Sequence, residues 1–119
     1  MTLAPSTGVG AAGEVCARLV AALPDRLGDA QRREVRGEPD RSAAWGDPAI
    51  TLVCGVPGGS RLDEPYAFDG VDWAMHDVGN ARTWTTLDRQ VNVEVTIPDA
   101  YDGQAELLGS LAAALTPTR

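Results

Sequence analysis

The chain has 119 residues, which is the length of one domain with its own hydrophobic core. With 44% hydrophobic and 23% charged residues, it has the composition of a globular protein rather than a disordered one. Seventeen acidic residues against ten basic ones give a net charge of −7, which argues against a nucleic-acid partner because such a partner needs a basic patch. No apolar run approaches the ~18 residues that cross a bilayer, so we expect no membrane-spanning helix in this sequence.

The first thirteen residues are small, polar and rich in glycine, and we interpret residues 1–13 as a flexible leader. From Glu14 onward the pattern is helical, and one apolar stripe consists of Cys16, Leu19, Val20 and Leu23. Pro24 disfavours helical geometry in the residue before it, so the predicted helix ends near Leu23.

The next segment is predicted to hold one clear strand. Residues 24–29 are interpreted as a turn, 32–37 as a short edge strand, and 38–48 as a loop that carries Trp45. Residues 49–54, AITLVC, follow as a strand in which Ile50, Leu52 and Cys54 share one side. A long irregular connection over residues 55–70 comes next.

The remaining strands show apolar residues at every second position. Residues 71–78 alternate, and residues 82–86 and 91–97 form a predicted hairpin around a short polar turn. In the last of these strands, Val91, Val93, Val95 and Ile97 are expected to face the core. Asp99 is the expected N-cap of a second helix, whose apolar stripe consists of Leu107, Leu108, Leu111, Ala112 and Leu115.

The predicted architecture is an α+β two-layer sandwich formed by residues 14–116 as a single domain. An antiparallel sheet of four to five strands has one dry face, and an N-terminal and a C-terminal helix are available to pack on that face.

The two cysteines have defined directions in this architecture. Cys16 lies on the core stripe of the first helix, and Cys54 lies on the core face of a strand. If helix and sheet pack as expected, the two thiols meet across the interface, and we favour a disulfide between them. Two buried free thiols are the alternative, because cysteine also packs as a small hydrophobe. A disulfide indicates an oxidising compartment, whereas free thiols are compatible with the cytosol.

A search for catalytic and metal-binding residues gives no strong constellation. His76 and Asp72 share one strand face and could form an acid–base pair, but an exposed histidine beside a carboxylate is the favoured interpretation because no motif positions a nucleophile. His76 is also the only imidazole, and it is directed away from the core that holds the cysteines, which argues against a zinc site. Residues 54–60 are rich in glycine but lack the lysine of a phosphate loop. We therefore expect no catalytic residues, no metal and no cofactor.

Aromatic residues are the remaining candidates for binding. Trp45, Tyr66 and Phe68 lie in or beside predicted loops and are the candidates for a binding surface. Trp45 either closes one end of the core or presents a flat stacking surface to a glycan or a peptide. Packing in the core is the default interpretation for such large rings. If Trp45 and Tyr66 both prove exposed and adjacent, the binding interpretation gains support. The facing of Trp84 stays open, because it shares its parity with Arg82 and Thr86.

Several stretches resemble a known family. AAWGDPAITLVCGVP (43–57), GVDW (70–73), WTT (84–86) and VEVTIP (93–98) occur in the order found in an actinobacterial domain-of-unknown-function family, the one numbered thirty-five-fifteen. The similarity runs from Val15 to Leu115. The resemblance implies a small envelope-facing protein, carried behind a membrane segment or signal that this sequence lacks, and it supplies no reaction and no catalytic residues.

These observations together predict a non-enzymatic extracytoplasmic domain of the actinobacterial cell envelope that binds an envelope protein or a cell-wall component. One alternative is a small hydrolase or transferase that uses His76 with nearby carboxylates. The other is a cytosolic globular domain with free thiols.

Overall fold

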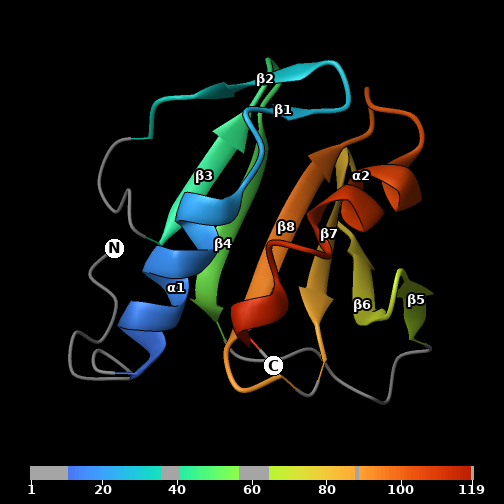
Figure 1. Cartoon of the computed structure of the whole chain (residues 1–119). Helices are drawn as coiled ribbons and strands as arrows, with labels where there is room; N and C mark the ends of the chain where they lie inside the picture. Colours follow the sequence, from blue (N-terminus) through green and yellow to red (C-terminus); the bar gives the residue numbers. More distant parts are fainter. Residues whose placement is uncertain (1–10, 36–40, 57–64, 88, 119) are drawn as a thin grey trace.

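A computed structural model describes residues 11–35, 41–56, 65–87 and 89–118. It is an α+β fold with the expected N-terminal and C-terminal helices and one antiparallel sheet (Figure 1). The helices are α1 (Ala11–Ala22) and α2 (Gln104–Leu111), and a short 3₁₀ helix, η1 (Thr116–Thr118), follows α2. The strands are β1 (Arg26–Leu27), β2 (Ala30–Arg33), β3 (Ser42–Trp45), β4 (Ile50–Val56), β5 (Tyr66–Phe68), β6 (Val71–Asp77), β7 (Ala81–Thr86) and β8 (Asn92–Pro98).

The prediction of four to five strands is wrong, because the described residues form eight strands in the order β1-β2-β3-β4-β8-β7-β6-β5. Two four-stranded meanders make up this sheet, one from β1 to β4 and the other from β5 to β8. They join where β4 pairs antiparallel with β8, with Leu52 opposite Val95. The sheet is open, with β1 and β5 at its two edges.

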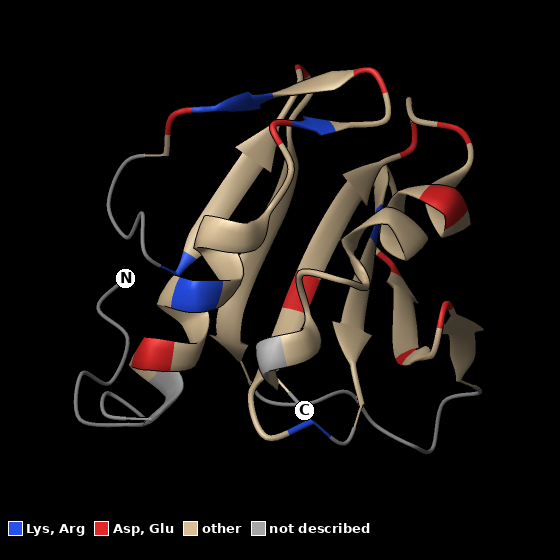
Figure 2. Cartoon of the chain, viewed as in Figure 1, with Lys and Arg blue, Asp and Glu red and all other residues tan. Residues whose placement is uncertain are grey.

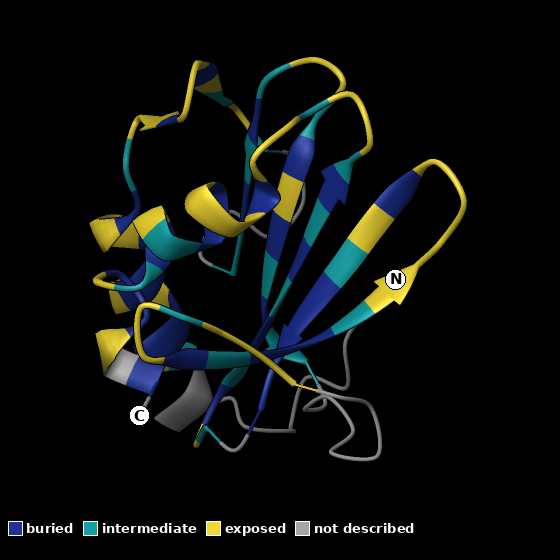
Figure 3. Cartoon of the chain, turned by 90° about the vertical axis from the view of Figure 1, so that its right-hand side faces the viewer, coloured by how far each residue is buried: buried dark blue, intermediate teal, exposed yellow. Residues whose placement is uncertain are grey.

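Both helices lie on the same face of the sheet, in front of it in Figure 1 and to its left in Figure 3. The strands alternate accordingly. In β8, Val93, Val95 and Ile97 are buried, while the residues between them are only half-buried. The side chains that face the helices therefore form the core, as the alternation predicts.

Helix α1 begins three residues before Glu14, so Ala11–Gly13, expected in the leader, form its first turn. The rest of the predicted leader, residues 1–10, lies outside the described residues. The expected stripe of Cys16, Leu19, Val20 and Leu23 is buried, as predicted. At the far end, the guanidinium of Arg32 donates to the carbonyls of Val20 (3.3 Å) and Leu23 (3.4 Å). Arg32 thus adds hydrogen bonds to carbonyl groups at the end of the helix, and the Val20 carbonyl also accepts from the amide of Leu23 (3.2 Å).

Helix α2 begins at Gln104, and the predicted N-cap at Asp99 is wrong. The backbone first makes a turn in which the amide of Tyr101 donates to the carbonyl of Pro98 (3.1 Å). It then passes through Gly103, which has φ 67° and occupies the N-cap position. The buried residues of α2 are Gln104, Leu107, Leu108 and Leu111, and Leu115, expected on the same stripe, is buried beyond the end of the helix.

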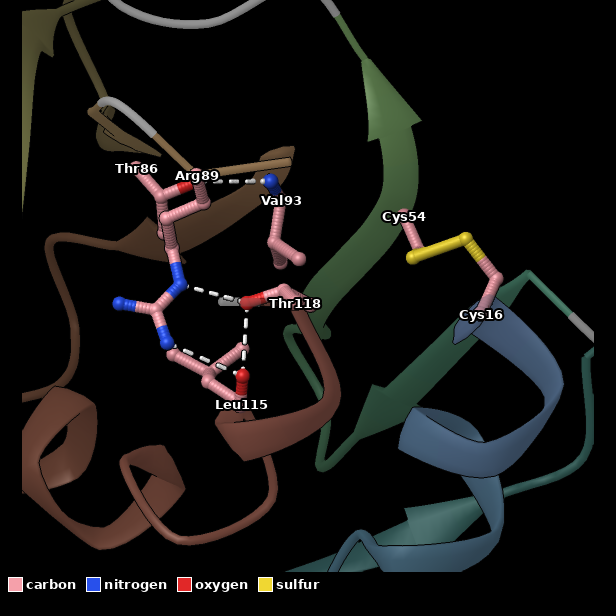
Figure 4. Close-up of a disulfide and its surroundings, with 7 residues drawn as sticks. All are labelled: Cys16, Cys54, Thr86, Arg89, Val93, Leu115 and Thr118. Atoms are coloured by element: carbon pink, nitrogen blue, oxygen red, sulfur yellow. Dashed lines mark hydrogen bonds between the residues drawn. A yellow bond between two sulfur atoms is a disulfide. The ribbon is translucent and has the colours of Figure 1, made fainter. Parts of the chain in front are cut away.

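Cys16 of α1 and Cys54 of β4 form a disulfide, with 5.7 Å between their Cα atoms and a sequence separation of 38 (Figure 4). The bond was predicted from the stripe of α1 and the alternation of β4. Neither cysteine is free, so the interpretation with free thiols is not supported.

A second attachment holds the C-terminal end of the chain. The Arg89 guanidinium donates to the Thr118 hydroxyl and to the carbonyl of Leu115 (3.1 Å) (Figure 4). The amide of Gln90 also donates to the carbonyl of Thr118 (3.0 Å). These bonds fasten η1 to the connection between β7 and β8. The helical layer is therefore fixed to the sheet covalently through α1 and by hydrogen bonds through η1.

Candidate functional site

Three aromatic rings from two strands meet on the helix side of the sheet near its β5 edge. Tyr66 and Phe68 lie two residues apart on β5, so they share a face, and Trp84 comes from β7. The ring centroids of Tyr66 and Trp84 are 5.4 Å apart with planes at 82°, and those of Phe68 and Trp84 are 5.7 Å apart at 66°. Both are edge-to-face arrangements, which aromatic pairs favour.

The three rings line a depression of about 490 Å³, here called the aromatic pocket. Its other walls include Arg82 of β7, Asp99 and Tyr101 of the connection between β8 and α2, and Gln104 at the start of α2. The Tyr66 side chain is 41% exposed and that of Trp84 only 4%. Trp84 thus forms the floor of the pocket and Tyr66 its rim.

The floor of the pocket is held by a buried hydrogen bond. The indole Nε1 of Trp84 donates to Oε1 of Gln104 at 2.9 Å. Because an indole nitrogen can only donate, the oxygen of the Gln104 amide must face Trp84, and the amide NH₂ is directed elsewhere. Among the residues that the structure describes, that NH₂ group has no hydrogen-bond partner.

A second and larger depression of about 800 Å³, here called the acidic depression, adjoins the aromatic pocket. It lies between the β1–β2 hairpin and the start of α2, and both depressions share Tyr101, Asp102 and Gly103. The Tyr101 hydroxyl donates to the carbonyl of Pro48 (2.6 Å), which ties this shared wall to the connection between β3 and β4. The two depressions therefore meet along one anchored segment.

The surroundings of both depressions are mostly acidic. Figure 2 shows acidic residues in the turn between β1 and β2, in the connection from β8 to α2 and on α2 itself. Two guanidinium groups, those of Arg26 and Arg82, line the depressions together with five carboxylates, those of Asp29, Asp47, Asp99, Asp102 and Glu106. The local field matches the net charge of −7 and disfavours an anionic ligand.

The expected binding residues separate in the structure. Tyr66 and Phe68 lie together at the aromatic pocket, whereas Trp45 is fully buried in β3 and its indole donates to the carbonyl of Pro24 (3.0 Å). The predicted loop around Trp45 is wrong because Ser42–Trp45 pairs with β4, which directs this ring into the core. Trp45 therefore contributes nothing to a binding surface.

The residues of the aromatic pocket that the sequence did not indicate include Arg82, Trp84 and Gln104. Trp84 shares its parity with Arg82 and Thr86, so the sequence left open which face of the sheet its side chain occupies. The strand pairing places Trp84 opposite Val95 of the core face, whereas Arg82 lies nearer the end of β7 and remains exposed at the pocket. Gln104 had no sequence signal, because its role depends on where α2 begins.

His76 lies apart from both depressions. It is exposed on β6, where it pairs with Thr83 of β7, and it lines neither the aromatic pocket nor the acidic depression. Asp72 is four residues away on the same strand, which at ~3.3 Å per residue separates the two backbones by about 13 Å. This separation does not favour the alternative interpretation, in which His76 and Asp72 form an acid–base pair.

The described part of the chain contains no group of three or more histidine, cysteine, aspartate or glutamate residues arranged to hold a metal ion. Within the same residues, neither helix is long and apolar enough to cross a membrane.

The comparison with protein families gives one match. A family model described as Protein of unknown function (DUF3515) matches residues 1–118. The chain belongs to the DUF3515 family. Comparison with curated proteins and with solved structures found no match.

In this DUF3515 member, the disulfide is the structural feature that indicates where in the cell the protein is located. A bond between Cys16 and Cys54 suggests an oxidising, extracytoplasmic location, because cytosolic thiols are kept reduced.

Proposed function

We propose that this DUF3515 domain is a non-enzymatic binding domain that acts outside the cytoplasm, in the actinobacterial cell envelope. The aromatic pocket is the observation that carries the proposal. It combines an exposed ring, a buried aromatic floor and a few polar groups, which is the general composition of a ligand site. The Cys16–Cys54 disulfide supports the location, and the family resemblance supports the envelope.

The fold suits such a role. The pocket lies where the β5 edge of the sheet meets the start of α2, and the helical layer is attached to the sheet by the disulfide and by the Arg89–Thr118 contact. A site built on fixed elements loses little conformational freedom when it binds. The partner is an envelope protein or a cell-wall component.

The location is tested by trapping cysteines in the native host. Cells are quenched in acid, and the protein is treated with a maleimide mass tag before and after reduction. We expect no tag before reduction and two tags after it, whereas the Cys54→Ala variant accepts one tag without reduction. Two tags on the unreduced protein would support a cytosolic domain with free thiols and overturn the proposal.

The binding role is tested by sedimentation of the purified domain with the isolated envelope fraction of the host. We expect Tyr66→Ala to reduce the sedimented amount. The control is Val78→Ala, which removes an apolar side chain that is 57% exposed and lines neither depression. Sedimentation that is absent for the unaltered domain, or equal for all three proteins, would contradict binding through the aromatic pocket.

A further inference from the structure

We propose that the aromatic pocket binds an uncharged oligosaccharide, with a sugar ring packed against Tyr66 above the Trp84 floor and its hydroxyl groups bonded by Arg82, Asp99 and Gln104. This inference rests on the proposed binding function and names the ligand class. Three features of the pocket support it: the aromatic rings, the presence of both hydrogen-bond donors and acceptors, and the charge of the surrounding residues.

The aromatic walls fit a ligand that has an apolar side and a polar rim. A pyranose ring has such a form, because its C–H groups make an apolar face while its hydroxyl groups project from the edge. Tyr66 is partly exposed and stands at right angles to the buried ring of Trp84. A ring seated there contacts aromatic carbon without burying its hydroxyl groups unpaired, which would be costly.

The polar groups of the pocket include both donors and acceptors. The NH₂ group of Gln104 is fixed as a donor because Trp84 holds the amide oxygen. Arg82 supplies further donors, and the carboxylate of Asp99 only accepts. Each sugar hydroxyl both donates and accepts, so this mixed set suits hydroxyl groups better than it suits a carboxylate or a phosphate, which only accept.

The charge around the pocket argues for an uncharged sugar. Five carboxylates and two guanidinium groups line the two depressions, so a uronate or a phosphate-bearing polymer would meet net repulsion. The adjoining acidic depression shares a wall with the aromatic pocket. A chain of several sugar units can therefore extend from one depression into the other.

The β5 edge is a poor site for an extended peptide. The strand has three residues, and Pro65 before it has no amide hydrogen. Phe68 and Val71 flank the two-residue loop of the β5–β6 hairpin, so in this hairpin geometry Tyr66 and Phe68 direct their backbone groups toward β6. Only Ala67 then presents an amide and a carbonyl at the edge. A peptide adding to β5 would gain too few backbone bonds, which leaves the pocket side chains as the recognition surface.

The test is an NMR titration in which the three indole N–H signals of the ¹⁵N-labelled protein are resolved and assigned. The probes are four uncharged tetrasaccharides: tetra-N-acetylchitotetraose, cellotetraose, maltotetraose and mannotetraose. At up to about 10 mM, a concentration that detects even millimolar dissociation constants, we expect at least one of them to shift the Trp84 indole signal saturably. The Trp45 signal should not move, because that indole is buried against Pro24.

Two variants check that the shift reports the pocket. Tyr66→Ala should weaken binding about three- to tenfold, the range expected for the loss of one aromatic contact, and Tyr66→Phe should restore it. Val78→Ala should bind like the unaltered protein. Dispersed indole signals in every variant confirm that each is folded.

Three outcomes would overturn the inference. The first is that none of the four sugars shifts the Trp84 signal. The second is that tetragalacturonic acid binds more tightly than every uncharged sugar. The third is that a capped Val-Thr repeat hexapeptide shifts the Trp84 signal and no sugar does. Envelope sedimentation that depends on Tyr66 would leave the binding function intact in each of these cases. Reduced cysteines in the host would instead overturn the proposed location, whichever probe binds.

Discussion

The three buried tryptophan residues differ in whether the N–H group of the indole has a hydrogen-bond acceptor. The indole of Trp45 donates to the carbonyl of Pro24, and that of Trp84 donates to Gln104. The Nε1 of Trp73 is buried and has no hydrogen-bond partner among the described residues. A buried donor without a partner costs about 1–3 kcal/mol, so Trp73 contributes packing at the expense of one unpaired N–H group.

This difference predicts unequal effects for the same substitution. Trp45→Phe and Trp73→Phe remove the same atoms from fully buried positions, and both should lower the free energy of unfolding. Trp45→Phe also leaves the Pro24 carbonyl without its donor, whereas Trp73→Phe removes an unpaired donor. We expect Trp45→Phe to be more destabilising by about 1–2 kcal/mol in urea denaturation. Equal losses of the free energy of unfolding would show that the indole N–H of Trp73 is as well hydrogen-bonded as that of Trp45.

At the residue scale, the sequence predicted which side of the sheet a side chain occupies wherever apolar residues recur at every second position. Val93, Val95 and Ile97 support one another, so their burial followed from the alternation of β8. Trp84 had no such support because Arg82 and Thr86 share its side. Thr86 is nevertheless buried, since its hydroxyl accepts from the Val93 amide (2.9 Å) and donates to the Asn92 side chain (2.9 Å). The burial of a polar residue that forms its hydrogen bonds with nearby groups cannot be predicted from the pattern of apolar residues.

At the scale of elements, the β5–β6 hairpin places two of the three pocket rings and depends on its two-residue turn. Asp69 has φ 51° and Gly70 has φ 84°, so both turn residues are left-handed. This combination suits the right-handed twist of the hairpin, and glycine adopts it without steric cost.

Two glycine-to-alanine substitutions, one in this turn and one in α1, should change the stability of the protein in opposite directions. Gly70→Ala should destabilise the protein by about 1 kcal/mol, because its φ is unfavourable for alanine. Gly13→Ala, within α1, should stabilise it by about 0.5–1 kcal/mol, because alanine favours the helix. An added Cβ has open space within 4 Å at both positions, so the difference isolates backbone conformation. Thermal denaturation measures both, and a shift of the same sign would contradict the argument.

The elements that sequence missed are short or begin at a glycine. β1, β3 and β5 have two, four and three residues, too few for alternation to be recognised, and β3 is mostly small residues. These strands exist because a longer neighbour pairs with them. The start of α2 was misplaced because Asp99 is a good N-cap in isolation, while the turn between Pro98 and Tyr101 delays the helix to Gly103. The long strands β4, β6 and β8 carried enough alternation to be predicted.

At the scale of the whole molecule, the disulfide links the first helix to the middle of the sheet across 38 residues. Closing a loop of that length in the unfolded chain is worth about 4 kcal/mol in the chain-entropy model. The double variant Cys16→Ala/Cys54→Ala should therefore lose a free energy of unfolding of that order in urea. Reductant should destabilise the unaltered protein and leave the double variant unchanged. A midpoint of the unaltered protein that does not respond to reductant would contradict a stabilising bond.

The two meanders should unfold as one unit, because the described strands of one meander pair with those of the other only where β4 meets β8, at the centre of the core. β4 and β8 each pair with a neighbour on both sides, and together they bury Leu52, Cys54, Val93 and Val95. Neither meander can expose its own half of this junction without exposing the other. Amide hydrogen exchange should therefore be slowest in both strands, with protection close to the global free energy of unfolding, and fastest in the edge strands β1 and β5. Protection that is high in β8 and uniformly low from β1 to β4 would instead show two separately unfolding halves. The pocket would then belong to the more stable half, because Tyr66, Trp84 and Gln104 all follow β4 in the chain.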